Sequence, residues 1–365
     1  MENPQEIESG PGRTFDFGPR RFLSALILAL ALAIVGAAVG VLSRGGALDL
    51  AAARPAQPAL LAVALLVTVI DVLAAGLRLH VLAHRISPRV RLRDCVRASL
   101  ANTCLAGLTP SQAGGGAAQL YVLNRAGLPW RAGVAIGTIN FLASIAVLAL
   151  AGLVARIGLH DALPGWLRLS TTATVTALGL LTIALLALLR WGQLAPTQDS
   201  IDSSRGVKRA VLQTRKFLHD SLEIARELFR EHPRHTAATI PLTALVYGAK
   251  LAFTIVVFRA YCPAGHFDDM IGALLVLVLA LYFAPTPGAS GLAEGATTAY
   301  LAGALGTASA AGFALWWRTL ALYVPVVIGG FVILAELARD ARPLAAPRKS
   351  GRSTPESAAP NRHAA

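Results

Sequence analysis

The sequence carries little charge for its length. Of its 365 residues only 15% are charged, while 55% are hydrophobic; a soluble protein has about 25% charged residues. This shortage argues against the two soluble domains that the length alone would predict, and it indicates one integral membrane unit. The net charge is nevertheless +13. Because the basic residues lie between apolar runs, we expect them to orient the chain and to meet anionic lipid headgroups, with no nucleic acid partner.

Cysteine is also scarce. Three cysteines are too few and too scattered for a disulfide framework. Cys262 and His266 would supply only two metal ligands, whereas a structural zinc site uses about four. The sequence contains no phosphate-binding Gly-x-x-x-x-Gly-Lys loop, so nothing indicates nucleotide-driven transport. We therefore expect no metal site, no cofactor and no enzymatic activity.

Long apolar runs, in contrast, are plentiful. A spanning helix needs about 20 mostly apolar residues. Six runs reach that length: residues 22–42, 59–79, 132–154, 167–189, 236–258 and 311–334. Two shorter runs, 95–108 and 270–284, end at segments rich in proline and glycine. The sequence predicts an all-α polytopic membrane protein with about six full spans.

Basic residues predict how these spans are oriented. Cytoplasmic segments are enriched in Lys and Arg, and four segments carry arginines and lysines outside the spans. They are a polar leader (1–20) with Arg13, Arg20 and the adjoining Arg21, the loop from Arg85 to Arg97, an amphipathic linker (about 191–234) and a tail that we expect to be disordered (338–365). Placing all four in the cytoplasm puts both termini there, with the transmembrane domain (21–337) in the plasma (inner) membrane.

That orientation requires the two short runs to return to the side from which they start. Residues 95–124 are too few for two crossings, which need about 40 residues, and 270–305 are interrupted by a similar break. We predict a re-entrant helical hairpin at each. The turns read GLTPSQAGGGAAQLYVL (107–123) and YFAPTPGASGLAEGATTAYL (282–301), and in both a Thr-Pro pair is followed, after three residues, by glycine.

The recurring turn predicts an inverted repeat, with 59–154 matching 236–334. Paired interrupted segments in corresponding halves indicate a transporter's binding site. The alternative is a pair of helix kinks packed against neighbouring helices, without a cavity.

Ionisable residues within the apolar runs are the other candidates for function. A charge at mid-bilayer costs about 2.5–3.5 kcal/mol on insertion scales, so it usually faces a partner or a cavity. Asp71 and Arg78 share a helical face. Asp71 either has a function or only balances the arginine, and Arg78 either faces a site or extends to the interface. Glu294 either caps a helix or lines a site. We expect Arg318 to pair with Glu294 or with an anionic headgroup, and Arg125 to act at the cytoplasmic mouth or only as an orientation charge.

The candidate headgroup-binding residues therefore combine charges in apolar runs with the proline and glycine of the two turns. They are Arg78, Pro110, Gly114, Gly115, Arg125, Pro287, Gly291, Glu294 and Arg318.

Three motifs carry a family resemblance. They are Pro110…Gly114-Gly115 with Arg125-Ala-Gly127, Pro285-x-Pro287-Gly288-x-x-Gly291-x-x-Glu294-Gly295, and Arg318-x4-Tyr323-x-Pro325-x3-Gly329. With them the chain, over about 20–337, resembles the lysylphosphatidylglycerol synthase transmembrane region, a flippase-like membrane family. The resemblance implies a bacterial-type inner-membrane protein that moves or handles a lipid with an anionic headgroup. Bifunctional members add a soluble aminoacyltransferase domain, for which this sequence leaves no place after the last span, so we expect no synthase activity.

Three functions are consistent with these features. The leading hypothesis is a flippase-like translocase for an anionic phospholipid, a polyprenyl phosphate or a hopanoid-type lipid. The second is a non-transporting membrane anchor for a separate synthase or glycosyltransferase, docked on the amphipathic segment 207–229. The third is an intramembrane lipid-headgroup enzyme that would use Asp71, Glu294 or Tyr282; it lacks the paired carboxylates or histidine cluster that such chemistry needs.

Overall fold

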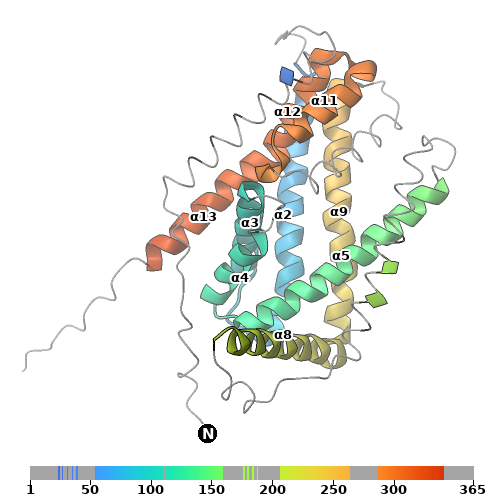
Figure 1. Cartoon of the computed structure of the whole chain (residues 1–365). Coiled ribbons are helices and arrows are strands. Elements are labelled where there is room, and N and C mark those ends of the chain that lie inside the picture. The colour runs from blue at the N-terminus through green and yellow to red at the C-terminus, as the bar shows by residue number, and fades with distance from the viewer. Residues whose placement is uncertain are drawn as a thin grey trace, which may run out of the picture.

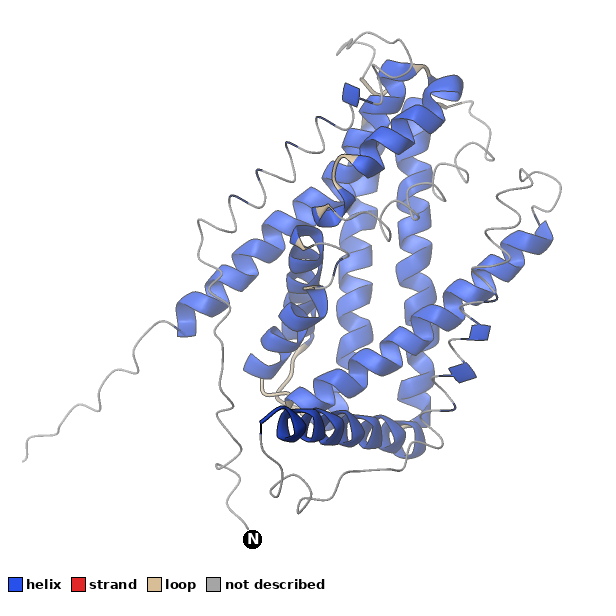
Figure 2. Ribbon diagram, viewed as in Figure 1, coloured by secondary structure: helices blue, strands red, loops and turns tan. Residues whose placement is uncertain are grey.

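The computed structural model describes residues 54–109, 114–158, 206–263 and 286–340, with a few isolated positions elsewhere. Within these ranges the chain is helical and has no strand (Figure 2), which confirms the predicted all-α class. Four stretches are long and apolar enough to cross a membrane: Ala59–Ile86, Trp130–Ala151, Pro233–Tyr261 and Thr307–Arg339. They correspond to four of the six predicted spans.

Several predicted segments lie outside the residues that the structure describes. The predicted spans at 22–42 and 167–189 lie outside the described residues except for isolated positions. The leader, the first arm of the second hairpin (270–284), Pro110 and the tail beyond residue 340 also lie outside them.

Helices α2 (Ala59–Ile86) and α9 (Pro233–Tyr261) form an antiparallel pair at the centre of the bundle (Figure 1). The backbone N–H of Gln57 donates to the carbonyl of Ala260 at 2.9 Å, so the start of α2 lies at the end of α9. Both helices are apolar around most of their circumference, and large side chains such as Leu66 and Leu73 of α2 are exposed. Such a surface is typical of a helix that faces lipid.

The segment predicted to form the first hairpin folds as two short packed helices, α3 (Leu92–Leu108) and α4 (Gly115–Arg125). Asn102 Nδ2 donates to Gln119 Oε1 across the pair at 2.8 Å. In the turn, Thr109 Oγ1 donates to the carbonyl of Leu105 at 2.6 Å and accepts from the N–H of Gly114 at 2.9 Å. Neither helix reaches the length of a span.

The chain between residues 286 and 340 is also interrupted by non-helical or irregular turns. A short 3₁₀ turn, η2 (Pro287–Ala289), precedes α11 (Leu292–Leu305), which folds back on α12 (Thr307–Arg318) through Gly306. A π-helical turn, η3 (Thr319–Tyr323), then joins α12 to α13 (Val324–Asp340). The last predicted span, 311–334, is therefore one helical rod with a π turn inside it.

Helix α8 (Gly206–Glu231) lies across one end of the bundle, beneath α5 (Trp130–Gly158) and α9 (Figure 1). Its predicted amphipathic character is confirmed in part, because Ala225 is buried against the bundle. Of the other apolar positions on that face, Val211, Leu218 and Phe229 remain exposed.

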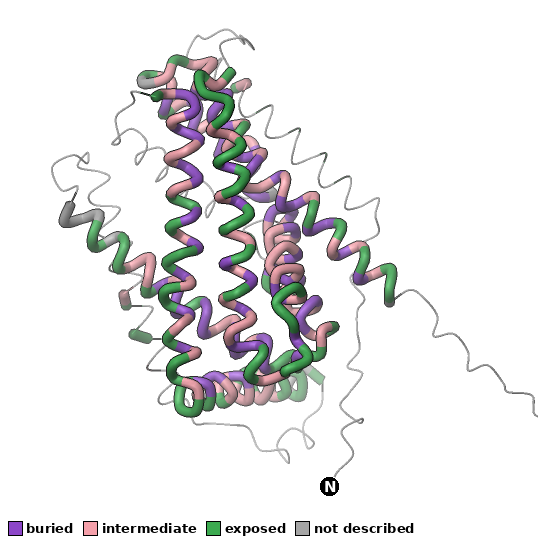
Figure 3. The backbone as a smooth tube through the Cα atoms, turned by 180° about the vertical axis from the view of Figure 1, so that it is seen from behind, coloured by how far each residue is buried: buried purple, intermediate pink, exposed green. Residues whose placement is uncertain are grey.

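Apolar side chains of the described residues gather in two separate cores. The first, at the α8 end, includes Leu82, Cys95, Leu123, Ile136 and Val326. The second, at the opposite end, includes Ala64, Phe253, Phe258, Leu301 and Phe313. Along α2 the second core ends at Val67 and the first begins at Leu79, and the mostly apolar stretch between them carries three polar residues, Thr68, Asp71 and Arg78. Figure 3 shows the buried positions lying where helices meet.

Candidate functional site

The two interrupted elements meet inside the protein. Turn η2 lies against the C-terminal end of α3. Gly288 is buried with φ +56°, and a Cβ added to it would lie 2.8 Å from the carbonyl oxygen of Gly107. Gly107 itself packs on the last helical rod, where a Cβ would lie 2.7 Å from Val326 Cγ2. Only glycine allows both this backbone conformation and this approach.

A buried ion pair lies directly beside this contact. Arg318 Nε donates to Glu294 Oε1 at 2.8 Å, and the two side chains are 1% and 0% exposed. Arg318 Nη2 also donates to the carbonyl oxygen of Gly288 in η2. Arg318 therefore pairs with Glu294, one of the two expected alternatives, and at the same time holds the turn that touches α3.

The Glu294 carboxylate is fully occupied by the protein. Its Oε1 also accepts from the Tyr323 hydroxyl at 3.0 Å, and its Oε2 accepts from the backbone N–H of Gly291 at 2.7 Å. Glu294 lies in the first turn of α11, where the partial positive charge of the helix N-terminus stabilises a carboxylate. Glu294 therefore caps the start of α11, as one interpretation predicted, and at the same time pairs with Arg318.

The π turn explains how Arg318 and Tyr323 reach the same carboxylate. Residues five apart lie on one side of a π turn but diverge in an α-helix of 3.6 residues per turn. The Arg318 guanidinium carbon also lies 5.8 Å from the centre of the Tyr323 ring, within the range of a cation–π interaction. Tyr323 was not predicted as a site residue from the sequence, although its place in the Arg318-x4-Tyr323 motif indicated that it could belong to the site.

Arg78 lies in a different cluster, between the two cores. Its Nη1 donates to Ser144 Oγ of α5 at 3.1 Å and to Thr243 Oγ1 of α9 at 3.2 Å. Asp71 forms its ion pair with Lys250 of α9 instead of with Arg78. Lys250 was missed in the sequence, although Thr243 and Lys250 repeat the seven-residue spacing of Asp71 and Arg78.

This cluster contains polar atoms without a hydrogen-bond partner. Buried atoms of this kind include Arg78 Nε, Asp71 Oδ1 and both amide atoms of Asn140. Asn140 lies one helical turn from Ser144 on α5 and is 5% exposed. The three long helices thus share a polar layer at the level between the two cores.

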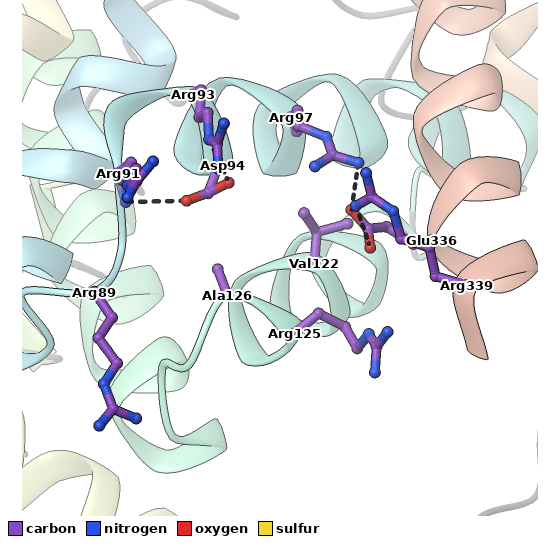
Figure 4. A pocket seen from close by; sticks show the side chains of 10 residues that line it. All are labelled: Arg89, Arg91, Arg93, Asp94, Arg97, Val122, Arg125, Ala126, Glu336 and Arg339. Carbon is purple, nitrogen blue, oxygen red and sulfur yellow. Dashed lines mark hydrogen bonds and ion pairs between the residues drawn. The ribbon is translucent and has the colours of Figure 1, made fainter. Parts of the chain in front are cut away.

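Arg125 lies at the α8 end of the bundle, in a cavity of about 560 Å³ that we call the arginine pocket (Figure 4). Its lining comes from α3, α4, α13 and the loop before α3. The lining residues are Arg89, Arg91, Arg93, Asp94, Arg97, Val122, Arg125, Ala126, Glu336 and Arg339. Arg97 and Arg339 both bind Glu336, the latter at 3.2 Å. Arg93 Nε lies 3.6 Å from Asp94 Oδ1.

Comparison with known families identifies the chain. The family model described as lysylphosphatidylglycerol synthase TM region matches residues 23–329. The chain belongs to this family. The match confirms the resemblance and establishes a membrane protein linked to lipid handling. A comparison with curated proteins found no match.

In this member of the lysylphosphatidylglycerol synthase TM region family, the predicted site residues within the described ranges divide among four places. Pro287, Gly291, Glu294 and Arg318 lie together at the turn that touches α3. Gly114 and Gly115 lie at the start of α4, where a Cβ on Gly115 would lie 2.6 Å from Asn102 Oδ1. Arg78 and Arg125 lie apart, in the polar layer and in the arginine pocket.

Proposed function

We propose that this chain moves a lipid with an anionic headgroup from one membrane leaflet to the other. The observation that supports this function is the contact between the α3 end and turn η2, with the Arg318–Glu294 pair beside it. Non-helical backbone at membrane depth is tolerated only where protein buries it or where it lines a cavity. Pairs of such breaks in corresponding halves are typical of transporter binding sites.

The proposal treats α3–α4 as a re-entrant hairpin in an inverted repeat. Helices α2 and α9 would be equivalent spans of the two halves, and their antiparallel packing is consistent with opposite orientation. The end that carries α8 and the arginine pocket would face the cytoplasm, because Lys and Arg concentrate on that side of a membrane.

In the proposed mechanism, the Arg318–Glu294 pair holds the path closed. Arg318 joins α12 to both η2 and α11. If a headgroup phosphate replaced Glu294 as the partner of Arg318, then α12, η2 and α11 would be released from each other. Guanidinium groups bind carboxylate and phosphate with similar geometry, so a phosphate can replace the carboxylate on Arg318. The Glu294 carboxylate would then keep the hydrogen bonds from the Tyr323 hydroxyl and the Gly291 N–H. The mechanism includes no covalent step.

A leaflet-exchange assay in reconstituted vesicles tests the proposal. The vesicles contain a fluorescent anionic phospholipid, and accessibility to a membrane-impermeant quencher reports its transfer between leaflets. We expect Glu294→Gln to abolish exchange, because a neutral amide cannot displace the headgroup phosphate from Arg318 and so cannot restore the closed pair after each transfer. Glu223→Gln, which removes a carboxylate paired with Arg226 on exposed α8, should leave exchange unchanged. Wild-type exchange in a folded Glu294→Gln protein would exclude the mechanism.

A membrane anchor for a separate lipid or cell-envelope enzyme is the second candidate. It is favoured by α8, which leaves Val211, Leu218 and Phe229 exposed on one end of the bundle. In the same assay, a folded wild-type protein that exchanges no lipid would favour the anchor over the translocase.

A further inference from the structure

The arginine pocket has more positive charge than its own acids can neutralise. Six arginines line it, against the two carboxylates of Asp94 and Glu336, which leaves a formal excess of four positive charges. The excess is concentrated around about 560 Å³, a volume within the range of small-molecule sites. Basic residues that only orient a membrane protein need no such common cavity.

The two acids serve to position arginines. The Glu336 side chain is 6% exposed and binds both Arg97 of α3 and Arg339 of its own helix. Asp94 accepts from the backbone N–H of Arg91 at 3.1 Å and lies beside Arg93. The Glu336 contacts pre-organise the guanidinium groups of Arg97 and Arg339, so less side-chain entropy is lost when a ligand binds. The Asp94 contact holds the backbone at the start of α3.

The pocket is built from helix ends that converge from distant parts of the sequence. The N-terminal turn of α3 and the C-terminal turns of α4 and α13 meet there (Figure 4). Val122 and Ala126 of α4 add an apolar part to the lining. A cavity with an arginine wall and an apolar wall suits a ligand that has a charged group attached to an apolar chain.

The geometry points to a headgroup with two or more negative charges. We propose that the arginine pocket binds a phosphomonoester or diphosphate lipid headgroup at the α8 end, before the lipid is moved. A phosphomonoester carries about −1.5 to −2 charges at pH 7, whereas a phosphodiester carries one. A phosphomonoester therefore balances an excess of four positive charges better than a phosphodiester does. Arginine also binds phosphate with two parallel hydrogen bonds to two of its oxygens.

This inference rests on the proposed function, since it names the headgroup class and the leaflet from which the lipid is loaded. Helix α3 connects the two places: Arg97 lies in the pocket and Gly107 at the turn contact. The pocket would thus receive the headgroup at one end of the helix whose other end adjoins the Arg318–Glu294 pair.

Binding to the full-length chain in phosphatidylcholine nanodiscs tests the inference. The probes are geranylgeranyl diphosphate, phosphatidylglycerol and inorganic pyrophosphate, each titrated at two salt concentrations. Loss of one charge-assisted contact costs about 1.5–3 kcal/mol, which is about tenfold or more in affinity. We therefore expect the double variant Arg89→Gln/Arg91→Gln to weaken geranylgeranyl diphosphate binding by at least that factor.

The matched control removes two exposed arginines outside the pocket, Arg209→Gln/Arg230→Gln. Equal weakening in both double variants would show that general surface charge binds the probe, and would overturn the inference. Equal affinity for phosphatidylglycerol would refute the requirement for two charges. Equal affinity for pyrophosphate would assign the pocket to a soluble ligand instead of a lipid.

The result is independent of leaflet exchange. If the pocket variant binds the diphosphate lipid as tightly as wild type while Glu294→Gln abolishes exchange, the inference fails and the proposed function stands. If the pocket binds as expected but the wild-type chain exchanges neither the fluorescent anionic phospholipid nor a fluorescent diphosphate lipid, the proposed function fails alone.

Discussion

Glu294 accepts hydrogen bonds from Arg318, Tyr323 and the backbone of Gly291, and its side chain has no exposed surface. A carboxylate in this position depends on all its partners, because an uncompensated charge in a low-dielectric interior is costly. The cost of an unpaired charge within an apolar run also led us to predict, from the sequence, that Arg318 has a partner.

The first prediction concerns the loss of that partner. Arg318→Ala should lower the free energy of unfolding by about 3–5 kcal/mol, since it leaves a buried carboxylate unpaired. Unfolding in mild detergent, followed by tryptophan fluorescence or circular dichroism, measures the change. Arg93→Ala is the control: Arg93 is 70% exposed beside Asp94, and exposed ion pairs contribute about 0–1 kcal/mol. Similar costs for the two variants would contradict a structural role for the buried pair.

Residue-level prediction from the sequence succeeded for buried charge and failed for pairing between distant segments. Glu294 and Arg318 could be matched because both lie near a recognisable break in one part of the chain. Asp71 was expected to balance Arg78, on the same helix face, but it pairs with Lys250. The choice of Lys250 as the partner depends on which face of α9 packs against α2. Because both helices are mostly apolar, the sequence does not show which faces are in contact.

At the scale of elements, the contact between η2 and α3 depends on backbone proximity. Gly288→Ala should destabilise the protein and separate the two elements. The left-handed backbone costs about 1–2 kcal/mol for a residue with a Cβ, and the added atom would also approach Gly107 O at 2.8 Å. Thermal unfolding in detergent measures the loss, and the exchange assay measures its functional consequence.

A matched glycine makes that experiment interpretable. Gly303 lies within α11, and a Cβ there would meet nothing within 4 Å. Gly303→Ala should be neutral or stabilising by up to about 1 kcal/mol, since alanine favours helix. A loss of stability in Gly303→Ala as large as in Gly288→Ala would show that the turn contact is not the cause.

At the scale of elements, the sequence predicted the spans and the breaks but not the π turn. Apolar length predicted the four described spans, and proline and glycine predicted the breaks, because lipid thickness and backbone chemistry act on local sequence. The π turn at Thr319–Tyr323 was not predicted. Its formation places Tyr323 on Glu294, so it depends on a tertiary contact that the 3.6-residue period of the sequence does not reveal.

At the scale of the whole molecule, the proposed topology makes opposite ends of the bundle accessible from opposite sides. In a Cys262→Ser background, Trp130→Cys at the start of α5 should react only with a reagent supplied from the cytoplasm. Gly303→Cys in α11 should react only from the periplasm. Both positions are exposed, and the remaining Cys95 and Cys104 are buried. Labelling of both positions from one side would refute the inverted arrangement.

The separation of the apolar packing into two cores has a consequence for how the protein tolerates damage. Ile136 belongs to one core and Phe313 to the other, and neither core includes the stretch of α2 between Val67 and Leu79. Ile136→Ala and Phe313→Ala should each cost about 2–5 kcal/mol. Because the two sites share no packed neighbour, a double-mutant cycle should give a coupling energy below about 0.5 kcal/mol. Substitutions in the core at one end of the bundle would then leave unchanged the stability cost of substitutions in the core at the other end.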